Sequence, residues 1–355
     1  MIVVQIILVM ILGLVIAGLF APSEALSWWQ RNYQHLEREP DSPIIDWPML
    51  EQAKSAPVPQ EDNVPEEVAE AVASPNPVVA SESDEHYLVY LSGIGTSGPD
   101  QLPIFEIPVV NKLAERLGKT CVIWDIYPYS VENQALTTGR RFSRLWQKLR
   151  IWKFEKRPGR FLAGMINVRN AFQMFVSSDR RYGPVFNLAV AEQIAAALLR
   201  HDYRPEDAKP VTLLGWSGGA QIALGATWYL AALGVPVRVI SMAGITSSDP
   251  GIDRATKIWH LHGDRDIITA GGKLLFPKRW RIFRNSAWNR ALADGRIEIV
   301  HLGALTHTGK LGYYSFQTTL PDGREPRQAT VDHIVEILVA AGLAEDNEGK
   351  FTAGS

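Results

Sequence analysis

The pentapeptide GWSGG at residues 215–219 constrains the fold of this chain more than any other feature. The apolar residues 211–214 before it predict a short buried strand, and residues 220–226 after it predict a tightly packed helix. A G-x-S-x-G sequence at a sharp strand-to-helix turn exposes its serine hydroxyl above the end of a sheet. The glycines leave room where a side chain would clash with the strand or the helix. We therefore predict that Ser217 is a nucleophile.

The rest of the chain from residue 85 to residue 345 alternates between strand and helix patterns. Strands are expected at 87–91, 121–126, 211–214, 237–243, 257–262 and 296–302, and helices at 108–117, 185–200 and 331–341. Such alternation implies an α/β fold with a mostly parallel sheet flanked by helices. About 260 residues are enough for one such domain with a substantial core.

Two candidate partners for Ser217 follow it along the chain. Asp266 comes just after the predicted strand 257–262, and His307 comes just after the predicted strand 296–302. The carboxyl ends of parallel strands lie at one edge of an open sheet, where active sites gather. We therefore expect the three side chains to lie close together.

In these motifs the chain resembles the α/β-hydrolase superfamily of serine esterases and lipases. The resemblance rests on the 215–219 nucleophile elbow, the G-x-x-D turn at 263–266 and the G-x-x-x-H loop at 303–307, in the order Ser, Asp, His. It implies a catalytic triad in which Ser217 attacks, His307 is the general base and Asp266 orients the imidazole.

The resemblance also implies an oxyanion hole made of two backbone N–H groups. One belongs to Gly218, the residue after the nucleophile, and the other comes from the loop after strand 87–91. In that loop Ile94 is the first candidate and Gly95 the second. Many family members begin this loop with His-Gly, whereas this chain has Ser92-Gly93, which leaves the donor open.

Other residues compete for these roles. Asp264 and Asp249 are alternative acids, although each also suits an ordinary turn. His301 lies within a predicted strand and is expected to be a packed or edge residue. The run from His260 through His262 to Asp264 resembles part of a metallo-β-lactamase ligand set, but Arg265 stands where another histidine usually follows. We therefore predict no metal site, and no P-loop or dinucleotide fingerprint predicts a cofactor.

The N-terminal residues 1–22 form an apolar stretch long enough to span a bilayer. We expect an uncleaved single-pass anchor, although residues 23–25 could also serve as a signal cleavage site. Arg31 and Arg38 follow the stretch and nothing basic precedes it, which favours a catalytic domain on the cytoplasmic side. Trp28, Trp29 and Tyr33 suit a membrane interface.

Two further segments are distinguished by composition. Residues 23–84 form a juxtamembrane segment followed by an acidic, Pro-rich stretch that is expected to be a disordered tether, and the tail 346–355 is expected to be disordered. Residues 130–182 form an insertion with a basic amphipathic helix pattern, which suits a lid or a membrane interface. Its apolar face comprises Phe142, Leu145, Trp146, Leu149 and Trp152, and its basic face Arg140, Arg141, Arg144 and Lys148. A second basic aromatic segment lies at 278–284.

These patterns predict a membrane-tethered serine hydrolase that cleaves an ester or acyl-type bond through an acyl-enzyme. The tether and the aromatic residues favour a lipid or fatty acyl substrate, but the triad alone does not distinguish hydrolysis from acyl transfer. The alternative is a non-catalytic membrane adaptor that binds lipid or protein through the basic aromatic insertion. No nucleic-acid-binding motif is present, the net charge is only −2 at pH 7, and the single Cys121 allows no internal disulfide.

Overall fold

The computed structural model describes residue 18 and residues 20–33, 46–47, 50, 80–99, 101–136 and 164–348. Most of the predicted anchor and of the acidic tether, residues 137–163 of the predicted insertion and the end of the tail lie outside these residues. No single helix in the described ranges is long and apolar enough to cross a membrane. Residues 164–178 and 183–200 meet the requirements of length and composition only as a pair, with a bend of 107° between them.

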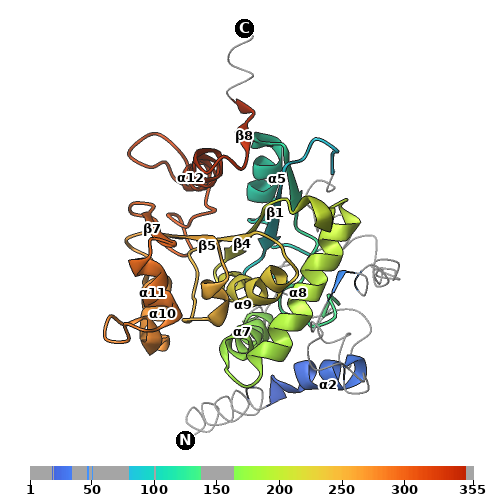
Figure 1. Cartoon of the computed structure of the whole chain (residues 1–355). Helices are drawn as coiled ribbons and strands as arrows, with labels where there is room; N and C mark the ends of the chain where they lie inside the picture. The colour runs from blue at the N-terminus through green and yellow to red at the C-terminus, as the bar shows by residue number, and fades with distance from the viewer. Residues whose placement is uncertain are drawn as a thin grey trace, which may run out of the picture.

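The core of the protein is a six-stranded parallel sheet with the strand order β3-β1-β4-β5-β6-β7 (Figure 1). Its strands are β1 His86–Leu91, β3 Thr120–Ile123, β4 Val211–Trp216, β5 Val237–Met242, β6 Lys257–His262 and β7 Ile297–His301. A separate antiparallel pair joins β2 Leu117–Gly118 to β8 Glu345–Asp346. All six expected strands are present, and β3 ends three residues earlier than expected.

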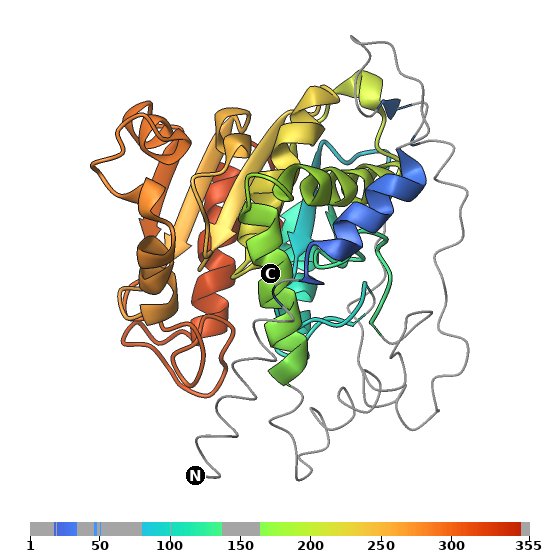
Figure 2. The ribbon, with the colours of Figure 1, turned by 90° about the horizontal axis from the view of Figure 1, so that it is seen from below.

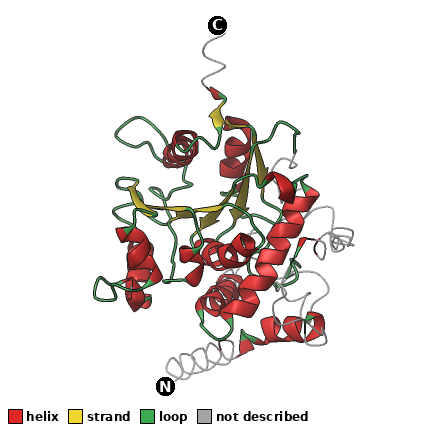
Figure 3. Ribbon diagram, in the orientation of Figure 1, coloured by secondary structure: helices red, strands yellow, loops and turns green. Residues whose placement is uncertain are grey.

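Helices cover both faces of the sheet (Figure 3). Their bounds are α2 Ser23–Asn32, α5 Ile107–Arg116, α7 Gly164–Ser178, α8 Gly183–Arg200, α9 Gly219–Ala232, α10 Ile267–Leu275, α11 Ala287–Ala293 and α12 Pro326–Ala340. Buried residues of α5 and α12 pack on one face, and buried residues of α7, α8, α9 and α11 pack on the other. The described residues therefore form the three-layer α/β architecture expected from the alternation.

Strand β1 contributes side chains to the hydrophobic cores on both faces of the sheet. Every residue of β1 is buried, and successive side chains point to opposite faces because a strand has a period of two. Leu88 and Tyr90 belong to the core under α5 and α12, whereas Val89 and Leu91 belong to the core under α8 and α9. This burial on both faces explains the continuous apolar run in the sequence.

The strand order reverses direction between β1 and β4. The chain moves from β1 to β3 on one side, then returns to place β4 on the other side of β1. In open α/β sheets, the crevice outside the carboxyl ends of two such strands is where ligands bind. Ser217 follows β4 directly, and the loop beginning at Ser92 follows β1 directly.

Helix α2 corrects one expectation about the segment after residue 22. Trp28 and Tyr33 are buried in the core on the α8 side of the sheet, so they do not project into a membrane interface. Figure 2 shows α2 lying beside α8. The Glu24 carboxylate also lies 2.6 Å from the Arg169 guanidinium on α7. Helix α2 therefore packs on the sheet domain through its buried residues Ala25 and Trp28.

Candidate active site

The backbone of Ser217 is held in a conformation that non-glycine residues rarely adopt. Its φ is 52°, in the left-handed region, where a side chain costs free energy. The N–H of Ser217 donates to the carbonyl of Met242 at 2.9 Å, and the carbonyl of Ser217 accepts from Ala220 and Ile245. These bonds from β5 and α9 hold the turn, so the strain is maintained by surrounding structure.

Glycines around Ser217 allow the turn to pack closely. A Cβ atom at Gly219 would lie 2.3 Å from the carbonyl oxygen of Leu91, and one at Gly215 would lie 2.4 Å from the Cα of Ala220. Both distances are shorter than real Cβ contacts. The glycines therefore have a steric reason at these positions, as the sequence pattern predicts.

We expect Gly219→Ala to destabilise the fold by about 1–3 kcal/mol, because the new methyl group overpacks against the β1 carbonyls. Thermal unfolding followed by circular dichroism would measure the change. Gly271→Ala on α10 is a matched control, since a Cβ there meets nothing within 4 Å and alanine favours a helix. A Gly219→Ala protein as stable as the wild type would contradict this packing argument.

His307 lies against Ser217 and is fixed by an aromatic neighbour. Its Nε2 is 2.9 Å from the Ser217 hydroxyl oxygen. The imidazole stacks on Trp216, with ring centroids 5.0 Å apart and planes inclined by 19°. Trp216 is the second residue of the GWSGG motif, so the motif supplies a platform for the histidine as well as the serine.

Asp266 holds the other nitrogen of the same imidazole. Its Oδ2 is 3.0 Å from His307 Nδ1 and also accepts from the hydroxyls of Thr269, at 2.7 Å, and Tyr313, at 2.8 Å. Its Oδ1 accepts from the backbone N–H groups of Ile268 and Thr269, because Asp266 is the N-cap of α10. The carboxylate therefore has one fixed orientation, with one lone pair committed to His307.

This environment keeps Asp266 ionised. Burial by itself would raise the pKa of Asp266, but hydrogen bonds from His307 and Thr269 outweigh it and hold the pKa at about 2. An ionised Asp266 accepts from Nδ1–H of His307, which leaves Nε2 as the acceptor that faces the Ser217 hydroxyl. In that tautomer of His307, the three groups are arranged as a general-base mechanism requires.

The alternative acids lie elsewhere. The carboxylate of Asp249 accepts from Gln221 at 2.9 Å and from the N–H of Gly251 at 2.8 Å, and burial raises its pKa to about 6. Asp264 pairs with His301 at 2.9 Å. His301 lies at the end of the edge strand β7, where its side chain is exposed and pairs with the Asp264 carboxylate. Of the two expectations for His301, it is therefore an edge residue and not a packed one. Of the three candidate acids, the structure brings only Asp266 to His307.

The loop after β1 lies beside the residue that follows Ser217. A Cβ at Gly218 would lie 2.8 Å from the side chain of Ile94, so these two predicted oxyanion donors belong to adjoining segments. Gly218 is also the N-cap of α9, where backbone N–H groups lack acceptors within the helix. The positive end of the helix dipole faces the same point. An anion formed on a group bonded to Ser217 would be stabilised here.

Two buried polar side chains fix this loop. Asn170 on α7 donates to the carbonyls of Ile94, at 2.9 Å, and Thr96, at 2.7 Å. On the other side, the hydroxyl of Ser92 donates to Glu106 at 2.7 Å. The bond to Glu106 gives the Ser92 hydroxyl a structural role at the start of this loop.

Sequence reasoning missed Tyr313, Thr269 and Asn170. Thr269 had a partial local signal, because aspartate is a favoured N-cap residue and its side chain bonds the backbone N–H three residues later, here that of Thr269. Tyr313 and Asn170 had none, since each meets the site through a long-range contact. The described part of the 130–182 insertion therefore has a structural role, because Asn170 on α7 holds the loop after β1.

A small aromatic cavity adjoins His307. It has a volume of about 230 Å³ and is lined by Phe105, Trp216, His307, Thr308, Gly309, Gly312, Tyr314, Ser315, Phe316 and Gln317. A second cavity of about 760 Å³ lies between α7, α8, α9 and the end of α10 and includes Asp249 in its lining. Of these two cavities, the first is the one that has His307 in its lining.

Comparison with known proteins assigns no family. No protein-family model matches the chain, and no curated protein matches it significantly. The α/β fold with its six-stranded parallel sheet and the geometry around Ser217 are therefore the basis for any statement about function.

Proposed function

We propose that this protein is a serine hydrolase of the α/β-hydrolase type that cleaves an ester or related acyl bond. The observation that carries the proposal is the continuous line from Ser217 to His307 to Asp266, with contacts of 2.9 and 3.0 Å. It starts from a serine with positive φ at the carboxyl end of a central strand. A hydrogen-bonded serine, histidine and aspartate of this kind, with the serine on a strained turn, is the arrangement that activates a hydroxyl.

The geometry supports a two-step mechanism. His307 Nε2 accepts the proton of Ser217 as Oγ attacks the acyl carbon, and Asp266 stabilises the imidazolium that forms. The negative charge on the carbonyl oxygen develops near Gly218 and Ile94, whose N–H groups are the proposed donors. His307 then gives its proton to the leaving alcohol. In the second step it activates a water molecule that hydrolyses the acyl-enzyme.

The surroundings of the site favour an apolar substrate. The cavity beside His307 has walls formed largely by aromatic rings. Helix α10, which begins directly after Asp266, exposes the large side chains of Ile267, Ile268, Leu274 and Leu275. Exposed apolar patches on a folded protein commonly mark a binding surface. We therefore propose a lipid or fatty acyl substrate, with the catalytic domain tethered at a membrane on its cytoplasmic side through residues 1–22.

Basic residues near α10 are compatible with anionic lipid. The segment 267–286 contains five basic residues and no acidic residue: Lys273, Lys278, Arg279, Arg281 and Arg284. Arg279 differs from the others because it is buried, with its guanidinium 3.7 Å from the ring centroid of Trp288. The predicted basic aromatic segment at 278–284 is therefore partly structural and partly exposed at Trp280, Ile282 and Phe283.

A fluorophosphonate probe tests the proposal, because it reacts with an activated serine. We expect the full-length wild-type protein to be labelled at one residue, and mass spectrometry of the tryptic peptides to place the adduct on Ser217. Prior heat denaturation is the control, since it removes the geometry and should prevent labelling. A folded protein that remains unlabelled would contradict the hydrolase proposal and favour the non-catalytic membrane adaptor.

A further inference from the structure

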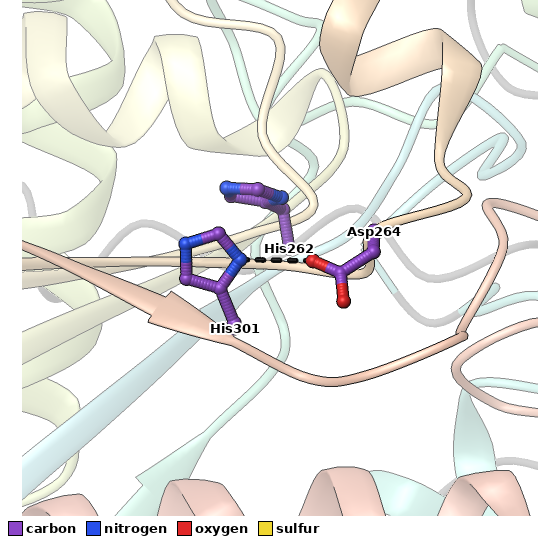
Figure 4. A group of neighbouring side chains, drawn as sticks. All are labelled: His262, Asp264 and His301. Carbon is purple, nitrogen blue, oxygen red and sulfur yellow. Dashed lines mark hydrogen bonds and ion pairs between the residues drawn. The ribbon is translucent and has the colours of Figure 1, made fainter.

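A second cluster of polar side chains lies close to the triad but outside it. His262 at the end of β6, Asp264 just after it and His301 at the end of β7 face one another (Figure 4). One donor atom from each side chain lies within 4.8 Å of the other two. The imidazole rings of His262 and His301 have centroids 4.7 Å apart. Neither histidine contributes to the contacts between Ser217, His307 and Asp266.

The backbone fixes the spacing of this cluster. His262 and His301 are partners in the register of the parallel strands β6 and β7, so their side chains emerge side by side on the same face. Just beyond them, the backbone N–H of Leu302 donates to the carbonyl of His262 at 3.0 Å, and the backbone N–H of Asp264 donates to the carbonyl of Gly303 at 2.7 Å. The three side chains therefore extend from a paired and hydrogen-bonded frame.

We propose that His262, Asp264 and His301 bind one divalent transition-metal ion, with Zn²⁺ as the best match. Two imidazole nitrogens and one carboxylate oxygen are donors that suit Zn²⁺ and related ions, and water would complete the coordination. His301 Nδ1 and Asp264 Oδ1 are 2.9 Å apart, and a bound ion would replace this contact.

Only small side-chain rotations are needed to reach metal-binding distances. Tetrahedral Zn²⁺ with bonds of about 2.0–2.1 Å places its ligand atoms roughly 3.3 Å from one another. The side chains of His301 and Asp264 are 61% and 58% exposed, so they turn without repacking the core. His262 is half-buried against its neighbours and provides the fixed member of the set.

The proposed metal site lies close in sequence to two residues of the candidate active site. Asp264 lies two residues before Asp266, and His301 lies six residues before His307. A metal ion held by both strand exits would cross-link the two loops that carry the acid and the base. Binding to the folded state alone stabilises it, so the ion should raise the unfolding temperature.

Isothermal titration calorimetry with Zn²⁺ on untagged full-length protein tests the proposal. We expect one ion per chain, and His301→Ala and Asp264→Asn should each weaken binding by about tenfold or more, the loss seen when even outer-shell groups are removed. Both replaced side chains are exposed, so the fold should be retained. His333→Ala on α12 is a matched control and should bind as the wild type does. The unfolding temperature should rise with Zn²⁺ in the wild type and in this control only.

Other outcomes would overturn the site. It is rejected if Zn²⁺ gives no binding heat up to about 1 mM, the weak limit of useful affinity, or if His301→Ala binds as tightly as the wild type. Loss of binding in His307→Ala with retention in His301→Ala would place the ion at the triad instead. Fluorophosphonate labelling in the presence of a chelator tests the activated serine without any bound metal. Labelling there would support the hydrolase proposal even if the protein bound no Zn²⁺.

Discussion

Ser217→Ala is expected to lower the turnover of an ester substrate by about 10⁶-fold, the scale found when the serine of a hydrolase triad is removed. The variant lacks the hydroxyl oxygen that lies 2.9 Å from His307 Nε2 and attacks the acyl carbon in the proposed mechanism, so no acyl-enzyme can form. Steady-state hydrolysis of short and long p-nitrophenyl esters would measure the loss, and fluorophosphonate labelling should disappear. Thermal stability should change little, because alanine replaces one hydroxyl at the same backbone position.

Ser247→Ala is a matched control for this result. Ser247 lies in the loop after β5, and its interaction with Gln221 uses the backbone N–H, which alanine keeps. Its turnover and labelling should equal those of the wild type. If Ser217→Ala were folded and still hydrolysed the esters at the wild-type rate, another nucleophile would be responsible and the mechanism proposed above would be wrong.

The sequence was sufficient to predict the sheet but less so its helices. Apolar runs marked the central strands, because β1 and β4 are buried on both faces and have few polar positions. The edge strand β7 was marked instead by alternating apolar and polar residues, since most of its side chains are exposed. Helices α10 and α11 were not predicted. Residues 267–275 follow a turn motif and contain Gly271 and Gly272, and glycine is a poor helix former. Helix α2 was taken for a membrane-proximal segment because packing on α8 leaves no local signal.

The same distinction applies to the candidate site. Ser217, Asp266 and His307 were found because each follows a strand, and strand ends in a parallel sheet converge. Tyr313 and Asn170 hold Asp266 and the β1 loop from distant parts of the chain, and nothing in their own neighbourhood marks them. His301 was considered only as a packed or edge residue, since His262 on β6 becomes its neighbour through strand register alone.

Asp266→Asn is expected to lower turnover by about 10⁴-fold, as in other triads where the acid becomes an amide. An amide cannot stabilise the imidazolium by charge, and its NH₂ group favours the wrong tautomer of His307. Asparagine is as good an N-cap as aspartate, so α10 should keep its start and the unfolding temperature should fall only slightly. Measuring turnover and thermal unfolding on the same preparation would separate the two effects.

Asp249→Asn provides the comparison that decides which acid acts. Asp249 is buried and bonded to Gln221 and Gly251, and its pKa is raised to about 6, so asparagine is close to its protonated form in shape and charge. Turnover should therefore stay within about tenfold of the wild type, far from the loss expected for a triad member. A 10⁴-fold loss in Asp249→Asn beside an active Asp266→Asn would reassign the acid. That result would also require a different orientation of the His307 side chain. Asp249 lies in the loop after β5, whereas Asp266 lies after β6, so the imidazole would have to leave its present contact with Tyr313 to reach Asp249.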